Sequence, residues 1–268
     1  MKRIACPLLL LHSDRVFRER VRAASKGHYE LQEVSSWEQL RDRVREAPPS
    51  ALVVVDPYEG DYGSESLSPT LHGLLREFPS ITILAACEAR RGSFEDLRMM
   101  GEWGVTRVIC LDEEDTPVAI TRHLRSAQGR PLRSLLLRSL PPQTSGTARA
   151  ILIAAADVVS VGGTAKDLAR SFHITTRTLL RWAKSAGLPP PQQLLPWMRM
   201  LLAAELLDDP GRTVLGVAYA CGYSSDSPLR NTMRAYIGVT PKVLRRGDAF
   251  ATATDAFLSA LNEARVKK

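Results

Sequence analysis

The chain has 268 residues, of which 44% are hydrophobic, and a formal net charge of +7. This length suits two ordinary domains, and this composition is typical of a folded protein rather than a disordered one. The sequence has no run of about 18 uncharged apolar residues. Its first apolar run also lacks the small-residue cleavage site of a signal peptide. We therefore expect a soluble, cytoplasmic protein with no membrane partner.

The charge is divided unevenly between the two halves of the chain. Residues 1–128 contain 17 Lys and Arg against 20 Asp and Glu, whereas residues 129–268 contain 19 against 9. The first half is thus mildly acidic and the second strongly basic, which favours a polyanion as the partner of the second half. A basic solvated surface without a partner is the alternative.

The four cysteines, Cys6, Cys87, Cys110 and Cys221, are widely spaced and form no C-x-x-C pair. This spacing predicts neither a zinc site nor a disulfide framework, so we expect buried thiols, no metal and no cofactor.

Short apolar runs alternate with amphipathic stretches through the first half. The predicted strands are 8–12, 28–34, 51–56, 81–87 and 106–111, and the predicted helices are 14–25, 36–47, 71–78, 93–104 and 116–127. Ser36 stands at an N-cap position. Continuous apolar strands separated by helices predict a parallel sheet covered on both faces, with ligand chemistry at the carboxyl ends of the strands.

The third predicted strand ends in Asp56, within VVVDPYEG. The order of elements and this aspartate resemble the response-regulator receiver domain, which implies a flavodoxin-like (βα)5 fold over residues 1–128. In that family an acid pair after the first strand binds magnesium, and the third-strand aspartate accepts a phosphoryl group. A Ser or Thr ends the fourth strand and a Lys ends the fifth, since the charge on a transferring phosphoryl group must be neutralised from several sides.

The chain departs from this pattern at each partner of the acceptor. The acid pair falls on His12 and Ser13, with Asp14 one place late, the hydroxyl position on Ala85 and the lysine position on Leu111. A lone aspartate without these charges should accept phosphate poorly. We therefore predict a receiver-like domain that has lost phosphotransfer and serves as a sensory or dimerisation domain.

Asp56 nevertheless stays the candidate phosphoacceptor, and a response regulator controlled there is the first alternative. Asp56 could instead cap the following loop, in which Pro57 precedes a Gly- and Ser-rich segment. His12 is either a pH- or ligand-responsive group in the same crevice or a satisfied histidine.

Residues 129–146 are predicted to be a helical linker. Leu132, Leu135, Leu136 and Leu140 have helical spacing among arginines, and PPQTSG follows. This amphipathic helix suits a domain junction or a dimer contact, and packing against the first domain is the alternative.

The segment 164–185 predicts a helix, a short break and a second helix that begins after an N-cap at Thr175. The residues expected to face inward are Leu168, Ala169, Ile174, Leu179 and Trp182.

Residues 213–247 repeat this design, with a turn at Gly222 and an N-cap at Ser224 or Ser225. The inward residues are here Val217, Ala218, Cys221, Leu229 and Met233. An apolar helix over 193–209 connects the two units.

The run CGYSSDS (221–227), which continues to GVTPKVLRR (238–246), resembles the AraC family of transcription regulators. The resemblance implies an all-helical, double helix-turn-helix DNA-binding domain over residues 147–250, followed by a C-terminal helical tail over 251–268. It implies a monomeric unit whose two recognition helices enter successive major grooves, about 34 Å apart.

The resemblance also implies which residues face DNA: Thr176, Arg177, Leu180, Arg181 and Lys184 in the first unit, and Ser225, Asp226, Ser227, Arg230, Asn231 and Arg234 in the second. Arg177 and Arg181 suit bidentate contacts to guanine, Asn231 suits adenine, and Asp226 could accept from cytosine.

Three residues depart from the family. Pro228 offers the groove no donor, Leu229 stands where an aromatic residue is usual, and Pro196 is expected to interrupt the start of the connecting helix. We therefore predict that the first unit carries base specificity and the second contributes phosphate contacts and shape reading.

The sequence thus predicts a DNA-binding transcription regulator and not an enzyme, because it has no nucleophile elbow, no H-E-x-x-H and no P-loop. The expected partners are double-stranded DNA, RNA polymerase, and a second copy bound through the receiver-like domain or the linker helix. A protein-interaction module whose DNA-reading helices have decayed is the second alternative.

Overall fold

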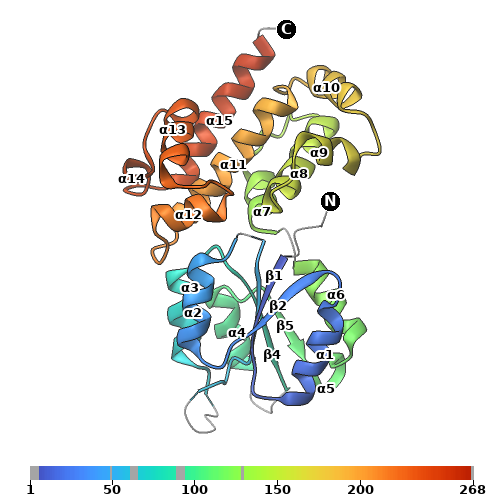
Figure 1. The fold of residues 1–268 in the computed structure, drawn as a ribbon, viewed down its shortest axis with the longest axis vertical. Helices are drawn as coiled ribbons and strands as arrows, with labels where there is room; N and C mark the ends of the chain where they lie inside the picture. The colour runs from blue at the N-terminus through green and yellow to red at the C-terminus, as the bar shows by residue number, and fades with distance from the viewer. Residues whose placement is uncertain (1–5, 49, 61–65, 89–93, 128–129, 267–268) are drawn as a thin grey trace. The chain divides into compact units, whose positions relative to one another are not determined.

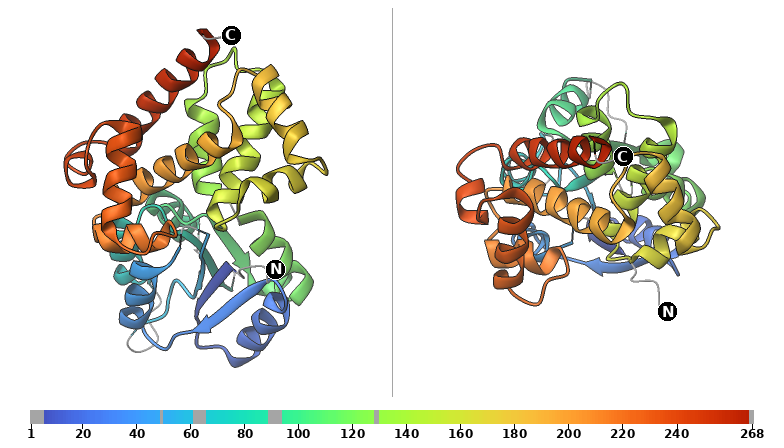
Figure 2. Two further views of the ribbon diagram at one scale, coloured as in Figure 1. Left: turned by 45° about the horizontal axis from the view of Figure 1, so that its top comes forward. Right: turned by 90° about the horizontal axis from the view of Figure 1, so that it is seen from above.

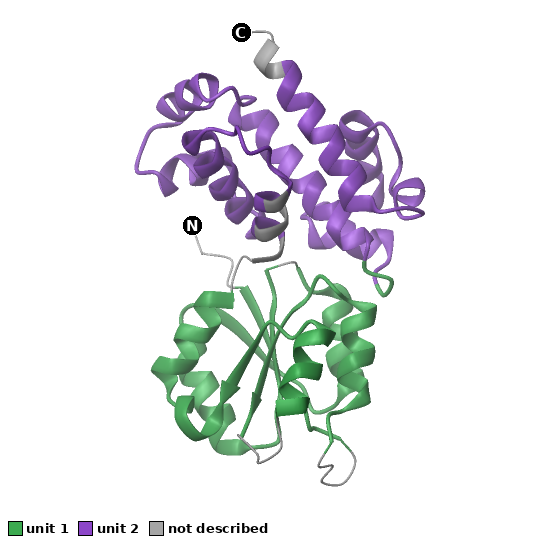
Figure 3. Cartoon of the chain, turned by 180° about the vertical axis from the view of Figure 1, so that it is seen from behind, with its two compact units in different colours: residues 1–128, 209–211 green, residues 129–208, 212–268 purple. Residues whose placement is uncertain are grey.

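The computed structural model describes residues 6–48, 50–60, 66–88, 94–127 and 130–266. The chain divides into two compact units, which Figure 3 colours separately: unit 1 comprises residues 1–128 and 209–211, and unit 2 comprises residues 129–208 and 212–268. Within the described residues, no helix has both the length and the apolar character needed to cross a bilayer.

Unit 1 is built on a parallel sheet. Its described strands are β1 (Cys6–Leu11), β2 (Tyr29–Glu33), β3 (Leu52–Val55), β4 (Thr82–Cys87) and β5 (Arg107–Cys110). They are ordered β2-β1-β3-β4-β5, with Leu9 opposite Val53 and Val53 opposite Ile83. The order reverses at β1, so the crevice between β1 and β3 lies at the switch point of the sheet.

Helices cover both faces of this sheet (Figure 1). On one face α1 (Arg15–Ser25) and α6 (Pro117–Ala127) pack on residues such as Leu8 and Leu10. On the other face α2 (Trp37–Glu46) and α3 (Pro69–Glu77) pack on Leu9 and Leu11, and α4 (Phe94–Trp103) covers the β4–β5 side. Because alternate residues face opposite helices, both faces must be apolar, as the continuous strand sequences predicted.

A side-chain cap confirms the predicted start of α2, and the structure has a short helix that the sequence did not predict. The Ser36 hydroxyl accepts a hydrogen bond from the Gln39 backbone N–H at 3.2 Å. The short helix α5 (Leu111–Glu114), which was not predicted, begins directly after β5.

Unit 2 consists of helices. They are α7 (Arg130–Ser139), α8 (Gly146–Ser160), α9 (Ala165–Ser171), α10 (Thr176–Ser185), α11 (Pro191–Leu207), α12 (Val214–Ala220), α13 (Asp226–Ile237), α14 (Pro241–Leu244) and α15 (Ala249–Val266). Most of α11 is buried, and α8 and α15 pack along it. Figures 1 and 2 show α11 running through the unit, with α10 and α13 towards its opposite ends.

The predicted interruption of the connecting helix at Pro196 is wrong, because α11 continues through that residue. A proline at this position removes the donor that would bond to the Gln192 carbonyl. Gln192 is exposed, so water can satisfy this carbonyl. Pro191, at the first helical position, fits the start of α11 for the same reason.

The leucines of the predicted linker helix are part of the core of unit 2. Leu132, Leu136 and Leu140 are buried in the same cluster as residues of α8 and α11. The side chain of Leu135 lies outside the described residues. The described leucine face is therefore covered within the unit and is not free for a dimer contact.

Helix α15 shares this core. Its buried residues, Ala249, Ala253, Phe257 and Leu261, recur at intervals of one helical turn. The carboxylate of Asp208, just after α11, accepts from the backbone N–H of Ala249 at 2.9 Å and of Phe250 at 3.0 Å. One side chain thus caps α15 and fixes it to the end of α11.

Candidate nucleic-acid interface

Helices α9 and α10 form the first helix-turn-helix unit. The backbone N–H and the hydroxyl of Thr164 both donate to Asp167 Oδ2, at 2.9 and 2.7 Å, which fixes the start of α9. The predicted N-cap of α10 is confirmed, since Thr175 Oγ1 accepts from the Thr178 N–H at 3.1 Å. Side-chain caps therefore set the beginnings of both helices.

The turn between these helices requires a left-handed residue. His173 has φ of 55° and is the one non-glycine residue with positive φ in the described part of the chain. Its N–H donates to the Arg170 carbonyl at 3.0 Å, and the Ile174 N–H donates to the Ala169 carbonyl at 3.1 Å. These two bonds satisfy the last carbonyls of α9 and turn the chain towards α10.

Helices α12 and α13 repeat the arrangement. Gly222, with φ of 80°, donates to the Tyr219 carbonyl at 2.9 Å, and Tyr223 donates to the Ala218 carbonyl at 2.9 Å. The predicted turn at Gly222 is therefore confirmed. Ser225, rather than Ser224, is the N-cap of α13.

The buried faces of the two helix-turn-helix motifs within unit 2 correspond. Leu168 matches Val217 in the first helices and Leu179 matches Leu229 in the second, and all four side chains are 0% exposed. The turn before α13 is thus one residue longer than the turn before α10. This shared core orients the opposite faces of α10 and α13 outward.

The prediction that Trp182 faces inward is wrong, because its side chain is 39% exposed. The buried positions of α10 are Leu179 and Ala183, one helical turn apart. Trp182 lies beside this stripe, and its ring packs edge-on against Phe172 at 6.1 Å between centroids. The space at the core position suits a methyl group and not an indole.

The outer face of α10 carries each residue of the first helix-turn-helix motif that is expected to contact DNA. Thr176, Arg177, Leu180, Arg181 and Lys184 are all exposed. Leu180, at 45%, is an unusually exposed leucine for an otherwise packed helix. No acidic residue occurs in α10 (TRTLLRWAKS), so its three basic side chains are not neutralised within the helix. This face is basic with an apolar centre.

The outer face of α13 is less basic. Ser227, Arg230, Asn231 and Arg234 are exposed, whereas Ser225 and Asp226 are half-buried. The Asp226 carboxylate forms an ion pair with Arg230 one turn along the helix. The N-terminal half of this face is therefore close to neutral, which leaves Arg234 as its remaining positive charge.

Arg245 has a structural role that the sequence did not indicate. This residue lies in the run GVTPKVLRR, and its Nε donates to the Leu207 carbonyl at 3.1 Å and so caps the end of α11. Arg246 beside it is exposed. Desolvation by its surroundings raises the pKa of the Cys221 thiol to about 12.

In unit 1, Asp56 follows β3 and binds its own loop. Its Oδ1 accepts from the Tyr58 N–H at 2.9 Å, and its own N–H donates to the Leu11 carbonyl at 2.9 Å. Asp56 thus caps the turn after β3, as one of the two sequence interpretations predicted.

The residues around Asp56 have other tasks. Asp14 Oδ1 accepts from the Val16 N–H at 2.7 Å and is the N-cap of α1. His12 is 6% exposed, its Nδ1 accepts from the Asp14 N–H at 3.1 Å, and its ring lies 4.5 Å from that of Phe17. Burial lowers the pKa of His12, and the nearby Asp56 carboxylate opposes this effect.

The other two receiver positions hold apolar residues. Ala85 is fully buried with Tyr58 and Met100, and Leu111 is the first residue of α5. Within the described residues, no group of three or more His, Cys, Asp or Glu side chains could hold a metal ion. The side chains present therefore do not fit the magnesium site of the receiver family.

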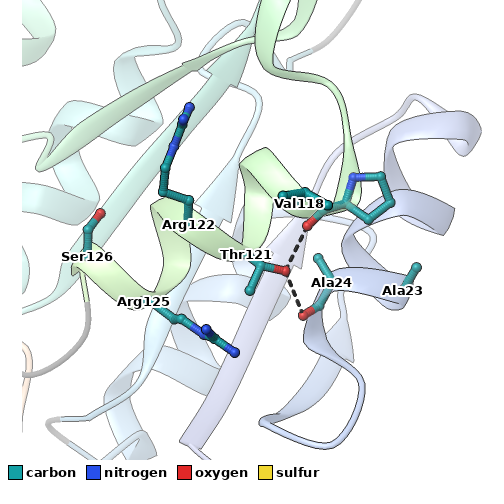
Figure 4. Close-up of a pocket in the computed structure, with 8 residues that line it drawn as sticks. Ala23, Ala24, Val118, Thr121, Arg122, Arg125 and Ser126 are labelled. Atoms are coloured by element: carbon teal, nitrogen blue, oxygen red, sulfur yellow. Dashed lines mark hydrogen bonds between the residues drawn. The ribbon is translucent and has the colours of Figure 1, made fainter.

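Unit 1 also has a shallow groove of about 660 Å³ between α1 and α6. Its lining is mostly apolar, and Thr121 bonds to the carbonyls of Pro117 and Ala24 at 2.7 and 3.3 Å (Figure 4). None of the predicted site residues lines this groove.

Residues 168–247 match a family model described as a helix-turn-helix domain, which is of the AraC type. This range begins within α9 and extends past α14, so it includes α10 and α13. No curated protein matches the chain. The match supports sequence-specific DNA binding and regulation of transcription by this part of the chain.

Proposed function

We propose that this chain regulates transcription by reading DNA mainly through α10, under the control of a receiver-like unit 1 that works without phosphorylation. The observation that carries the proposal is the exposed basic face of α10, which a helix-turn-helix core holds outward. RNA polymerase and a second copy bound through unit 1 complete the proposed set of partners.

Base reading is assigned to Arg177 and Arg181. They lie one turn apart on the exposed face and present the planar donors that pair with O6 and N7 of guanine. Leu180 between them suits the methyl group of thymine. Lys184, at the end of α10, reaches the phosphate backbone and adds affinity without sequence preference.

We assign α13 mainly to contacts with the phosphate backbone of DNA. Ser225 makes no capping hydrogen bond with its side chain, so its hydroxyl is available to a phosphate. Arg234 supplies a positive charge, while Arg230 is engaged with Asp226. Asn231 is the residue of this helix best suited to a base, as a bidentate partner of adenine.

The phosphorylation-independent role of unit 1 rests on the side chains at the strand ends. Asp56 is held by its loop, Asp14 caps α1, and Ala85 and Leu111 supply neither a hydroxyl nor a cation. Phosphoryl transfer to Asp56 would lack the charges that stabilise it. The alternative, a response regulator controlled at Asp56, requires donor-dependent DNA binding.

Selection of the full-length protein against a random duplex library at about 150 mM salt tests the proposal. The experiment is run with and without magnesium and a small phosphoryl donor. We expect a motif with two blocks about one helical turn apart that the donor does not change. A donor-dependent motif would favour the working response regulator, and the absence of any motif would favour the interaction module.

Variants then assign the two helices. Arg177→Ala or Arg181→Ala should cost about 1–3 kcal/mol at the selected site and relax the preference at one position. Arg234→Ala should weaken all sequences alike and reduce the salt dependence by about one phosphate contact. Arg76→Ala removes an exposed charge from unit 1 and is the matched control. If Asn231→Ala alone abolished the preference, the assignment of the two helices would be reversed.

A further inference from the structure

Two of the four cysteines are brought together at the carboxyl ends of neighbouring strands. Cys87 is the last residue of β4 and Cys110 is the last residue of β5. They are direct partners in the parallel pairing of these strands, although 22 residues separate them in the sequence. Neighbouring strands lie about 4.8 Å apart, which is within the Cα separation that a disulfide spans.

The two side chains also point to the same face of the sheet. Paired residues of adjacent parallel strands share a face, and successive residues alternate. The preceding pairs follow this rule, since Ala86 and Ile109 lie in the core under α1 and α6, whereas Ala85 and Val108 lie in the cluster with Met100 of α4. Cys87 and Cys110 therefore both project to the α4 side.

Both residues of this pair are partly exposed. Cys6 is only 5% exposed, and Cys221, which is also partly exposed, belongs to unit 2. Asp112 Oδ2 lies 3.8 Å from Cys110 Sγ and accepts a hydrogen bond from it. Both strands end at these cysteines, so strand pairing does not restrain the backbone beyond them.

We propose that Cys87 and Cys110 form an oxidisable dithiol site, which a hydroperoxide closes to an intramolecular disulfide. One thiolate attacks the peroxide to give a sulfenic acid and releases an alcohol or water. The other thiol attacks the sulfenic sulfur and displaces the hydroxyl group as water. Two thiols and one hydroperoxide thus give one disulfide, one alcohol and one water, and thiol reduction reverses the change.

This site is independent of the proposed DNA binding, because it rests on strand pairing within unit 1. A disulfide in a reducing compartment is typically transient and redox-sensing rather than structural. The site would respond to oxidants at the same edge of the sheet as Asp56.

Mass spectrometry of the full-length protein tests the inference. The reduced protein is treated with hydrogen peroxide, remaining thiols are blocked, and the protein is digested with trypsin without reduction. Cys87 and Cys110 fall in different tryptic peptides, residues 77–90 and 108–122. We expect these peptides to become linked, with a yield that does not depend on protein concentration and that falls to zero after thiol reduction.

Cys87→Ser and Cys110→Ser should each abolish the link, and Cys6→Ala, as the matched control, should leave it in place. If either serine variant fails to fold, the wild-type digest decides alone. Sulfinic or sulfonic acids at Cys87 or Cys110 without linked peptides would overturn the inference. Links between two chains, or links to Cys6 or Cys221 in place of the pair, would overturn it as well.

Discussion

The ion pair on α13 gives the sharpest test of how the two recognition helices divide their work. Asp226 is in the first turn of α13 and pairs with Arg230 four residues later. As an acid near a helix N-terminus it stabilises the helix by about 0.3–1 kcal/mol, and an exposed pair at this spacing adds about 0.3–0.5 kcal/mol. Asp226→Asn should therefore lower the free energy of unfolding by roughly 0.5–1.5 kcal/mol.

The same substitution should strengthen DNA binding. It removes a negative charge that would face phosphates and releases Arg230 for one additional phosphate contact. One contact makes the slope of log K against log salt steeper by about 0.9. Fluorescence anisotropy with the selected duplex, from about 50 to 200 mM salt, measures this slope, and urea denaturation measures stability.

Glu263→Gln is the control, because it removes one exposed negative charge from α15 without a partner on α13. Weaker binding of Asp226→Asn, confined to sites with a cytosine in the part of the motif that α13 contacts, would refute this prediction. That result would mean that Asp226 accepts from the cytosine amino group and that α13 reads bases directly.

Four further substitutions test individual features of the fold. His173→Gly should raise the free energy of unfolding in urea by about 0.5–1 kcal/mol by relieving a left-handed non-glycine residue, and Gly222→Ala should lower it by a similar amount. Asp208→Ala should cost about 1 kcal/mol and reduce the hydrogen-exchange protection of the first turn of α15. Because the pKa of buried His12 is lowered, the folded state binds fewer protons than the unfolded state below about pH 6.5. The free energy of unfolding should therefore decrease as the pH is lowered below this value. The slope is at most about 1.4 kcal/mol per pH unit, and it should be lost in His12→Gln but kept in the exposed His28→Gln.

The sheet could be predicted from the sequence because several strands are continuous apolar runs that all indicate the same parallel arrangement. Leu8 to Leu11 and Leu52 to Val55 can only be buried on both faces, and this requires a parallel sheet between helices. The caps at Ser36 and Thr175 were equally readable, since a hydroxyl at an N-cap acts locally.

The wrong predictions concern residues whose position depends on tertiary packing rather than on local sequence. Helical spacing puts Trp182 near the inner face of α10 but does not say that the core position next to it has room only for Ala183. Pro196 was predicted to break a helix that its neighbours hold together on several sides. The pairing of Cys87 with Cys110 depends on the register of two strands, which spacing along the chain does not reveal.

The carboxylates at the strand ends of unit 1 take part in the local hydrogen bonding of the fold. Asp56 accepts a hydrogen bond from a backbone N–H of its own loop, and Asp14 accepts one from the first turn of α1. We therefore expect about 10 mM magnesium to leave the melting temperature of unit 1 unchanged, because the described residues include no group of three His, Cys, Asp or Glu side chains that could hold the ion.

Introducing an acid pair after β1 makes this expectation testable. The double variant His12→Asp, Ser13→Asp supplies two oxygen ligands after β1, beside Asp56. If magnesium is present at tenfold its dissociation constant, binding should stabilise the variant by about 1.4 kcal/mol, which raises its melting temperature. His12→Asn, Ser13→Asn is the control of matched size without the charges. Equal stabilisation of the wild-type protein, lost in Asp56→Asn, would show that a metal site survives there and would make phosphorylation at Asp56 the better proposal.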